Sequence, residues 1–106
     1  MLFFKKKTAA DKTANDRSIV EDNSLYVDAL IAISKSETLT VKLKELREKL
    51  KYLISSDNAK VLDCDKKIKN QLEDIKLAIV KEKPEEKLLD MINEVYVIIA
   101  ERNIAL

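Results

Sequence analysis

The sequence predicts an all-α fold: a small antiparallel bundle of about four helices, the last two forming a long helical hairpin. Three observations lead to this prediction. The 106 residues include no glycine and a single proline, so the tight turns of sandwiches, barrels and phosphate-binding α/β folds lack the residue they need. Hydrophobic residues (46%) and charged residues (37%) are both abundant. Apolar side chains also recur every three or four residues, which is the period of an amphipathic helix.

Residues 1–17 show no such period, and we expect them to form a flexible basic N-terminal tail in front of a helical bundle at 18–106. Five bases against two acids give this tail a net charge of +3. Ser18 and Glu21 have the spacing of a capping box, in which each side chain binds the backbone N–H of the other. The first helix is therefore predicted to begin at Ser18.

A cluster of hydroxyl residues at positions 34, 36, 38 and 40 separates the first helix from the second. Hydroxyl side chains compete with helical hydrogen bonds and serve as N-caps, so we expect a break here. One kinked helix over 18–54 is the alternative. The second helix carries a coiled-coil-like stripe of leucines at 39, 43, 46, 50 and 53.

The turn residues at 55–58 precede a third helix, whose apolar stripe consists of Val61, Cys64, Ile68, Leu72, Ile75 and Ile79. Pro84 and two following acids mark the start of a fourth helix, because proline and negative charge suit the first helical turn. Its stripe consists of Leu88, Ile92, Val95, Ile99 and Leu106. Both connections of the third helix are short, so we expect it to pack antiparallel against the second and the fourth.

The side chains that most enzymes need are scarce. The chain has no histidine, which is the commonest general base and metal ligand. Cys64 is the only cysteine; it excludes an internal disulfide, favours a cytoplasmic location and fits a small packed hydrophobe. Glu45 and Glu48 have a spacing found in Mg²⁺-binding helices, but Glu48 falls opposite the leucine stripe and should face solvent. We expect no catalytic site, no metal and no cofactor.

The fourth helix is the best candidate for a binding surface. Residues 95–100 are all apolar, so one face of a helix cannot hold them all. Val97 and Ile104 point away from the main stripe, while Met91 and Ile98 extend its flank. We expect these four residues to contact a protein partner or a second copy of the chain. The alternative is a central helix that is buried on all sides of a monomer.

The predicted function is thus a non-enzymatic helical protein-interaction module that self-associates. One alternative is weak association with a membrane surface through an apolar and basic start, namely Leu2, Phe3, Phe4, Lys5, Lys6 and Lys7. The other is weak nucleic-acid binding through five bases at 42–51. Acids interrupt that run, and the net charge of the chain is only +1, which disfavours this reading. No stretch has the roughly 18 apolar residues of a transmembrane helix.

Three polar residues, Asp65, Arg102 and Asn103, interrupt the seam between the last two helices. With a turn near 82–83, antiparallel pairing places Asp65 opposite residue 100, and Arg102 lies about 3 Å further along the axis. We therefore predict an Asp65–Arg102 ion pair with Asn103 beside it. A paired polar contact would disfavour slipped alignments of the helices. A small polar pocket or partner contact is the functional alternative.

Overall fold

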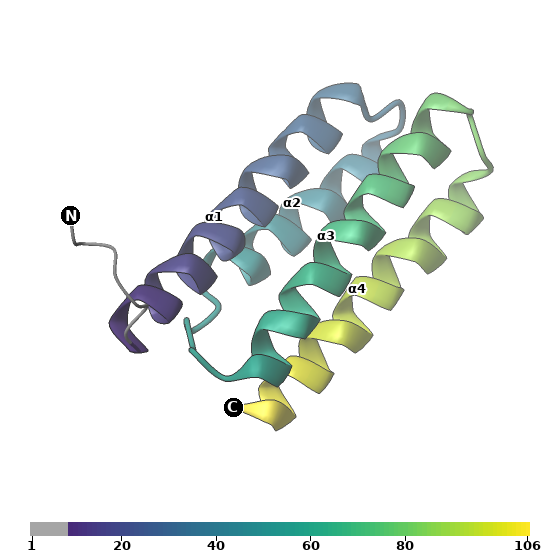
Figure 1. The fold of residues 1–106 in the computed structure, drawn as a ribbon. Coiled ribbons are helices and arrows are strands. Elements are labelled where there is room, and N and C mark those ends of the chain that lie inside the picture. The colour runs from purple at the N-terminus through teal and green to yellow at the C-terminus, as the bar shows by residue number, and fades with distance from the viewer. Residues whose placement is uncertain (1–8) are drawn as a thin grey trace.

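The structure is a computed structural model that describes the backbone of residues 9–106 and the side chains of residues 17–106. Four α-helices form this part of the chain: α1 (Ala9–Ile33), α2 (Glu37–Lys51), α3 (Ala59–Val80) and α4 (Glu85–Ala105). Helices that follow one another in the chain run in opposite directions (Figure 1). The predicted all-α bundle of four helices is confirmed, and the region 18–54 forms two helices rather than one kinked helix.

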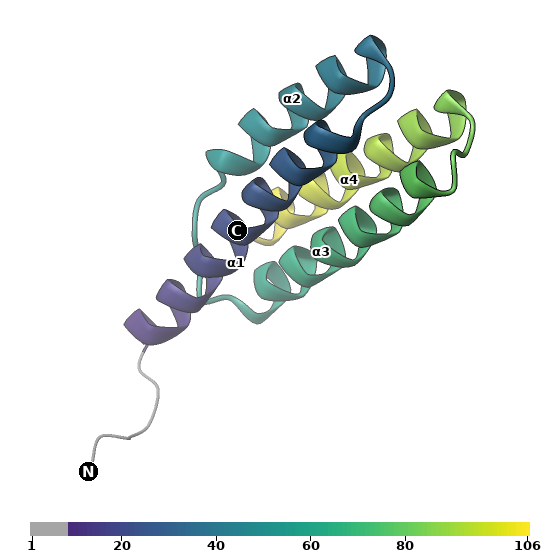
Figure 2. The ribbon, with the colours of Figure 1, turned by 90° about the horizontal axis from the view of Figure 1, so that it is seen from above.

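The bundle consists of two helical hairpins, α1–α2 and α3–α4, packed against each other. Between the hairpins, α1 runs along α3 and α2 runs along α4, each pair in the same direction (Figures 1 and 2). The expectation that α2 and α3 are packed neighbours is wrong, because within the described chain they occupy diagonal positions without close backbone contact. The connection 52–58 spans roughly 20 Å when extended, which is enough to cross the end of the bundle diagonally.

The first helix begins earlier than the sequence predicted. It starts at Ala9, so Ser18 lies inside α1 and the Ser18–Glu21 spacing does not mark a helix start. Residues 9–17 include several alanines, which have the highest helix propensity and favour continuation of the helix. The first turns of α1 extend past the start of α3 (Figure 2). Of the predicted tail, residues 1–8 lie outside the described residues.

Side-chain caps mark the starts of α2 and α3, and a turn without glycine ends α3. Ser36 caps α2, since its hydroxyl accepts a hydrogen bond of 3.0 Å from the Leu39 amide. Asn58 caps α3 in the same way, accepting from the Lys60 amide at 2.8 Å. At the end of α3, Glu82 adopts a left-handed φ of 57°. The Lys83 amide then donates to the Ala78 carbonyl at 3.0 Å, closing a turn that usually uses glycine.

The α1–α2 and α3–α4 turns lie at the same end of the bundle and contact each other. The Ser36 hydroxyl donates a hydrogen bond to the Glu85 carboxylate, and Lys35 lies 3.9 Å from the Glu82 carboxylate. Between this end and the other, the predicted apolar stripes meet in one core. Its completely buried side chains come from all four helices and are Val27, Leu30, Leu43, Leu46, Leu50, Ile68, Leu72, Ile75 and Val95.

Candidate functional site

A buried ion pair lies between α3 and α4, inside the core. The Arg102 Nε atom donates to Oδ1 of Asp65 at 2.7 Å, and Nη2 approaches Oδ2 at 3.3 Å. Both residues have an exposed fraction of 0%. The structure thus contains the pair predicted from the helix register, in the two-pronged geometry that arginine forms with carboxylates.

A third polar residue joins this pair from α1, and it is not Asn103. Asn23 is 2% exposed, and its Nδ2 atom donates to the backbone carbonyl of Asp65 at 3.2 Å. Asn103 is exposed instead, because one residue further along a helix turns the side chain by about 100° away from the core. The predicted position of Asn103 is therefore wrong. The sequence does carry a signal for Asn23, which lies three and four residues from the buried Val20 and Val27.

The polar cluster formed by Asn23, Asp65 and Arg102 connects three helices at one level of the bundle. Its charges neutralise each other, and neither Asp65 nor Arg102 has surface open to solvent. A substrate could not reach the pair without opening the bundle. We assign the cluster to specifying how the hairpins align, because buried charges favour arrangements in which they stay paired.

Cys64 is packed as the sequence predicted. The side chain is 7% exposed and belongs to the hydrophobic core. Burial is the main factor that raises the pKa of the Cys64 thiol, and the nearby acids Glu101, Asp63 and Asp65 raise it further, while Lys67 lowers it. A raised pKa disfavours the thiolate, which is the nucleophilic form of cysteine.

The carboxylates of the described side chains do not converge on a metal site. No three of their His, Cys, Asp or Glu residues come close enough to hold an ion. Glu45 is exposed and lies 3.7 Å from Lys42, while Glu48 is exposed and lies 3.4 Å from Arg47. These two acids therefore belong to surface ion pairs.

The four residues predicted as an interface on α4 divide into two pairs. Val97 and Ile104 are exposed, by 50% and 87% respectively. Ile98 is buried and Met91 is partly buried against the core, so these two residues pack inside the molecule instead of forming a partner surface. The difference arises because α4 contacts both α3 and α2, which widens the part of its circumference that the bundle covers. Val97, Ala100 and Ile104 remain as an exposed apolar row, which we call the α4 outer face.

A groove adjoins this face at the end of the bundle that holds the C-terminus. It has a volume of about 640 Å³ and lies between α2 and α4. Its apolar lining consists of Tyr52, Leu53, Ile54, Tyr96 and Leu106. Tyr52 and Ile54 are exposed by 71% and 69%, so the groove is open to solvent. The charged and polar residues Glu45, Glu48, Lys49 and Asn103 complete its lining. Tyr52 and Ile54 were not predicted from the sequence as surface residues, although two apolar side chains next to a turn are a visible signal.

Two further binding surfaces were predicted from the sequence, a basic run at 42–51 and the N-terminal segment Leu2–Lys7. Arg47, in the basic run at 42–51, donates to Asp28 of α1 at 2.9 Å, which leaves it less available to phosphate. The segment Leu2–Lys7, proposed above to contact membranes, lies outside the described residues. Within the described residues, no helix combines the length and the hydrophobicity that crossing a membrane requires.

No protein-family model, curated protein or solved structure matches this chain.

Proposed function

We propose that the chain is a non-enzymatic, cytoplasmic protein-interaction module that self-associates through the α4 outer face. The observation that carries this proposal is the exposure of Val97 and Ile104, by 50% and 87%, on one side of the same helix. Residues seven apart lie two helical turns apart on the same face. A row of exposed branched apolar side chains loses unfavourable contact with water when a second surface covers it.

The groove between α2 and α4 extends this surface. A stable interface buries about 800 Å² on each partner, which is more than Val97 and Ile104 can provide alone. Tyr52, Ile54 and Leu106 add large exposed side chains at the same end of the molecule. Tyrosine also contributes strongly to many interfaces, since it buries a large ring and retains a hydrogen-bonding hydroxyl.

The chemistry of the described side chains supports an interaction role over catalysis. The ion pair of Asp65 and Arg102 is closed to solvent, and burial raises the pKa of the Cys64 thiol, which disfavours the nucleophilic thiolate. The single cysteine also supports the cytoplasmic location, where thiols stay reduced.

A single charge on the α4 outer face tests the proposal. Val97→Glu should convert a dimer or larger assembly into the 12.1 kDa monomer, measured by light scattering after gel filtration at micromolar concentration. A carboxylate buried in an apolar contact without a partner disfavours that contact strongly. Circular dichroism should show unchanged helix content, since Val97 is already half exposed in the single chain.

Leu77→Glu is the matched control. Leu77 is an apolar residue on α3 with an exposed fraction of 56%, close to that of Val97. The control should leave the mass of the assembly unchanged. If Val97→Glu leaves the mass unchanged, or if both variants reduce it equally, the α4 outer face is not the contact.

A further inference from the structure

The surface of α4 carries a strong negative charge beside its apolar row. Its exposed charged residues are five acids and one base, which give a net charge of −4: Glu85, Glu86, Asp90, Glu94, Glu101 and Lys87. The remaining base of the helix, Arg102, is buried against Asp65 and does not offset this charge at the surface. Any partner of the α4 outer face must therefore approach a negatively charged helix.

Two of these acids stand next to the exposed apolar residues. Glu94 and Glu101 each precede one of them by three residues, namely Val97 and Ile104, so each acid lies one turn from an apolar side chain. Neither acid forms an ion pair with another described residue. Lys60 and Lys67 of α3 line the same shallow pocket as Glu101 without forming an ion pair with it. The surface thus combines an apolar row with two carboxylates that no described base pairs.

This charge distribution disfavours the simplest form of self-association. In a two-fold symmetric contact, the same patch of each copy faces its counterpart. Pairing two α4 outer faces would bring Glu94 and Glu101 of one copy near the acids of the other, and like charges repel across an interface. A partner segment with apolar side chains followed by positive charges fits the surface better.

One segment of this chain has that composition. Residues 2–7 read Leu-Phe-Phe-Lys-Lys-Lys; they contain both phenylalanines of the chain and its one run of three consecutive bases. Three large apolar side chains match the α4 outer face and the adjoining groove, and three lysines match the acids of α4. We propose that the Leu2–Lys7 segment of a second copy occupies the α4 outer face. This inference rests on the proposed self-association and names the surface that the second copy contributes.

The contact so formed joins two different surfaces. Such a head-to-tail contact closes into a ring or extends into a chain, according to the rotation between copies. Its ionic part weakens as salt is added, because exposed charges are screened over about 8 Å at physiological ionic strength. A purely apolar contact between two α4 helices would instead lose like-charge repulsion and strengthen with salt.

The test measures the mass of the full chain by sedimentation velocity, at low and high salt, for four sequences. Phe3→Ser with Phe4→Ser removes the aromatic side chains of the segment, and Glu94→Lys with Glu101→Lys reverses the charge of its binding surface. Each double variant should be monomeric at concentrations where the unaltered chain is assembled. Combining Glu94→Lys and Glu101→Lys with Lys5→Glu, Lys6→Glu and Lys7→Glu should restore the assembly, since the opposite charges are then exchanged.

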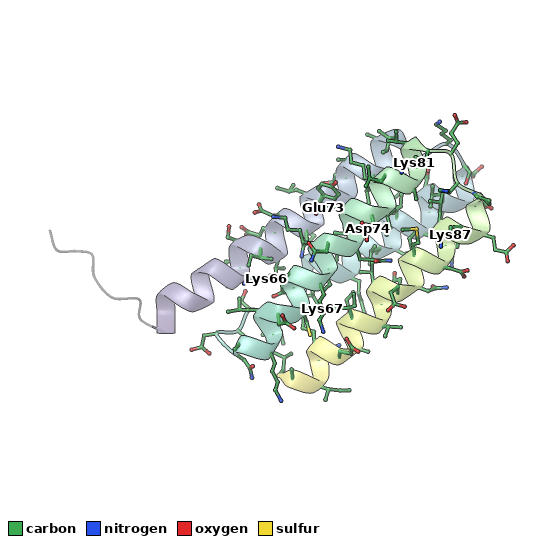
Figure 3. The ribbon with its side chains drawn as sticks, turned by 45° about the vertical axis from the view of Figure 1, so that its right-hand side comes forward. Lys66, Lys67, Glu73, Asp74, Lys81 and Lys87 are labelled. Atoms are coloured by element: carbon green, nitrogen blue, oxygen red, sulfur yellow. The ribbon has the colours of Figure 1, made fainter. Side chains whose placement is uncertain are left out.

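Glu73→Lys with Asp74→Lys is the matched control. These two exposed acids belong to the middle of α3 and not to α4 (Figure 3). Reversing their charge should leave the assembly intact. Circular dichroism of every variant should match that of the unaltered chain, which separates loss of contact from loss of fold.

The possible outcomes separate this inference from the proposed function. If Val97→Glu dissolves the assembly but the phenylalanine variant does not, self-association through α4 stands and the segment is not its occupant. If the charge exchange fails to restore an assembly that both double variants lose, the inference is wrong as well. If the unaltered chain is monomeric and binds phosphatidylserine vesicles through Phe3 and Phe4, the segment serves a membrane and both proposals fail.

Discussion

The buried pair of Asp65 and Arg102 shows how a single contact constrains a core that is otherwise apolar. Apolar side chains tolerate a shift of one helix along another, because leucine and isoleucine pack in many similar arrangements. A buried carboxylate and guanidinium tolerate it poorly, since each ion loses its partner after a shift. The bond of 2.7 Å between them, together with the bond from Asn23, fixes α1, α3 and α4 at one level.

A double-mutant cycle measures this coupling. Asp65→Ala and Arg102→Ala should each lower the free energy of unfolding by about 3–5 kcal/mol, because each leaves one buried charge unpaired. The double variant should lose less than the sum of the single losses, since no unpaired charge remains. Chemical denaturation followed by circular dichroism gives the values. Strictly additive losses would contradict the pairing.

The backbone conformation of Glu82 is a second single-residue feature that affects the free energy of unfolding. Its left-handed φ of 57° brings Cβ close to the backbone, a strain that glycine lacks. Glu82→Gly should raise the free energy of unfolding by roughly 0.5–1 kcal/mol, since relief of strain exceeds the entropy cost of glycine at such a position. The lost contact with Lys35 is exposed and contributes little.

Glu82→Gln is the control for this prediction. It removes the charge but retains Cβ, so thermal unfolding should scarcely change. Equal effects of the glycine and glutamine variants would assign the gain to charge and not to backbone strain.

At the scale of the helices, Ser18, which the sequence predicted as a helix start, and Ser36, one of four hydroxyl residues predicted as possible caps, behave differently. Ser36 caps α2 and binds the Leu39 amide, whereas Ser18 lies within α1. Ser36→Ala should therefore cost about 1 kcal/mol of stability. Ser18→Ala should instead add up to about 0.5 kcal/mol, because alanine is the better helix former in a helix interior.

Thermal unfolding of the two variants, side by side, checks this prediction. A loss of about 1 kcal/mol for Ser18→Ala would mean that the helix begins at the capping box after all.

The helices themselves could largely be read from the sequence, because period and capping are local properties. The stripe from Leu39 to Leu50 and the break at the hydroxyl cluster 34–40 needed no knowledge of the rest of the chain, although the sequence leaves open which of the four hydroxyls caps α2. The start of α1 could not be read in this way, since a capping-box spacing also occurs inside a helix. The diagonal placement of α2 and α3 could not be predicted either. A connection as long as 52–58 lets two successive helices pack side by side or lie at diagonal corners of the bundle.

The candidate site was predictable to a similar extent. Asp65 and Arg102 form the predicted pair, because two helices joined by a short turn have only one close alignment. Asn103 was misplaced and Asn23 was omitted, since neither the rotation of α4 nor the packing of α1 against α3 is known before the bundle is assembled. The exposure of Val97 and Ile104 followed from the pattern, whereas the burial of Met91 and Ile98 depended on how α2 covers α4.

At the scale of the whole molecule, two hairpins enclose one core and leave one helix with both apolar and acidic surface. The α4 outer face remains outside the core because α2 and α3 already occupy the two flanks of α4. The same arrangement that buries Arg102 thus exposes Ile104, two residues later on the opposite side of the helix. Assembly with a second copy is the use of this surface that we propose.

The mass of the unaltered chain over a range of concentration tests this central claim most directly. Sedimentation velocity from low to high micromolar concentration should show an average mass that rises well above 12.1 kDa, because association depends on concentration. A mass of 12.1 kDa throughout that range would contradict self-association.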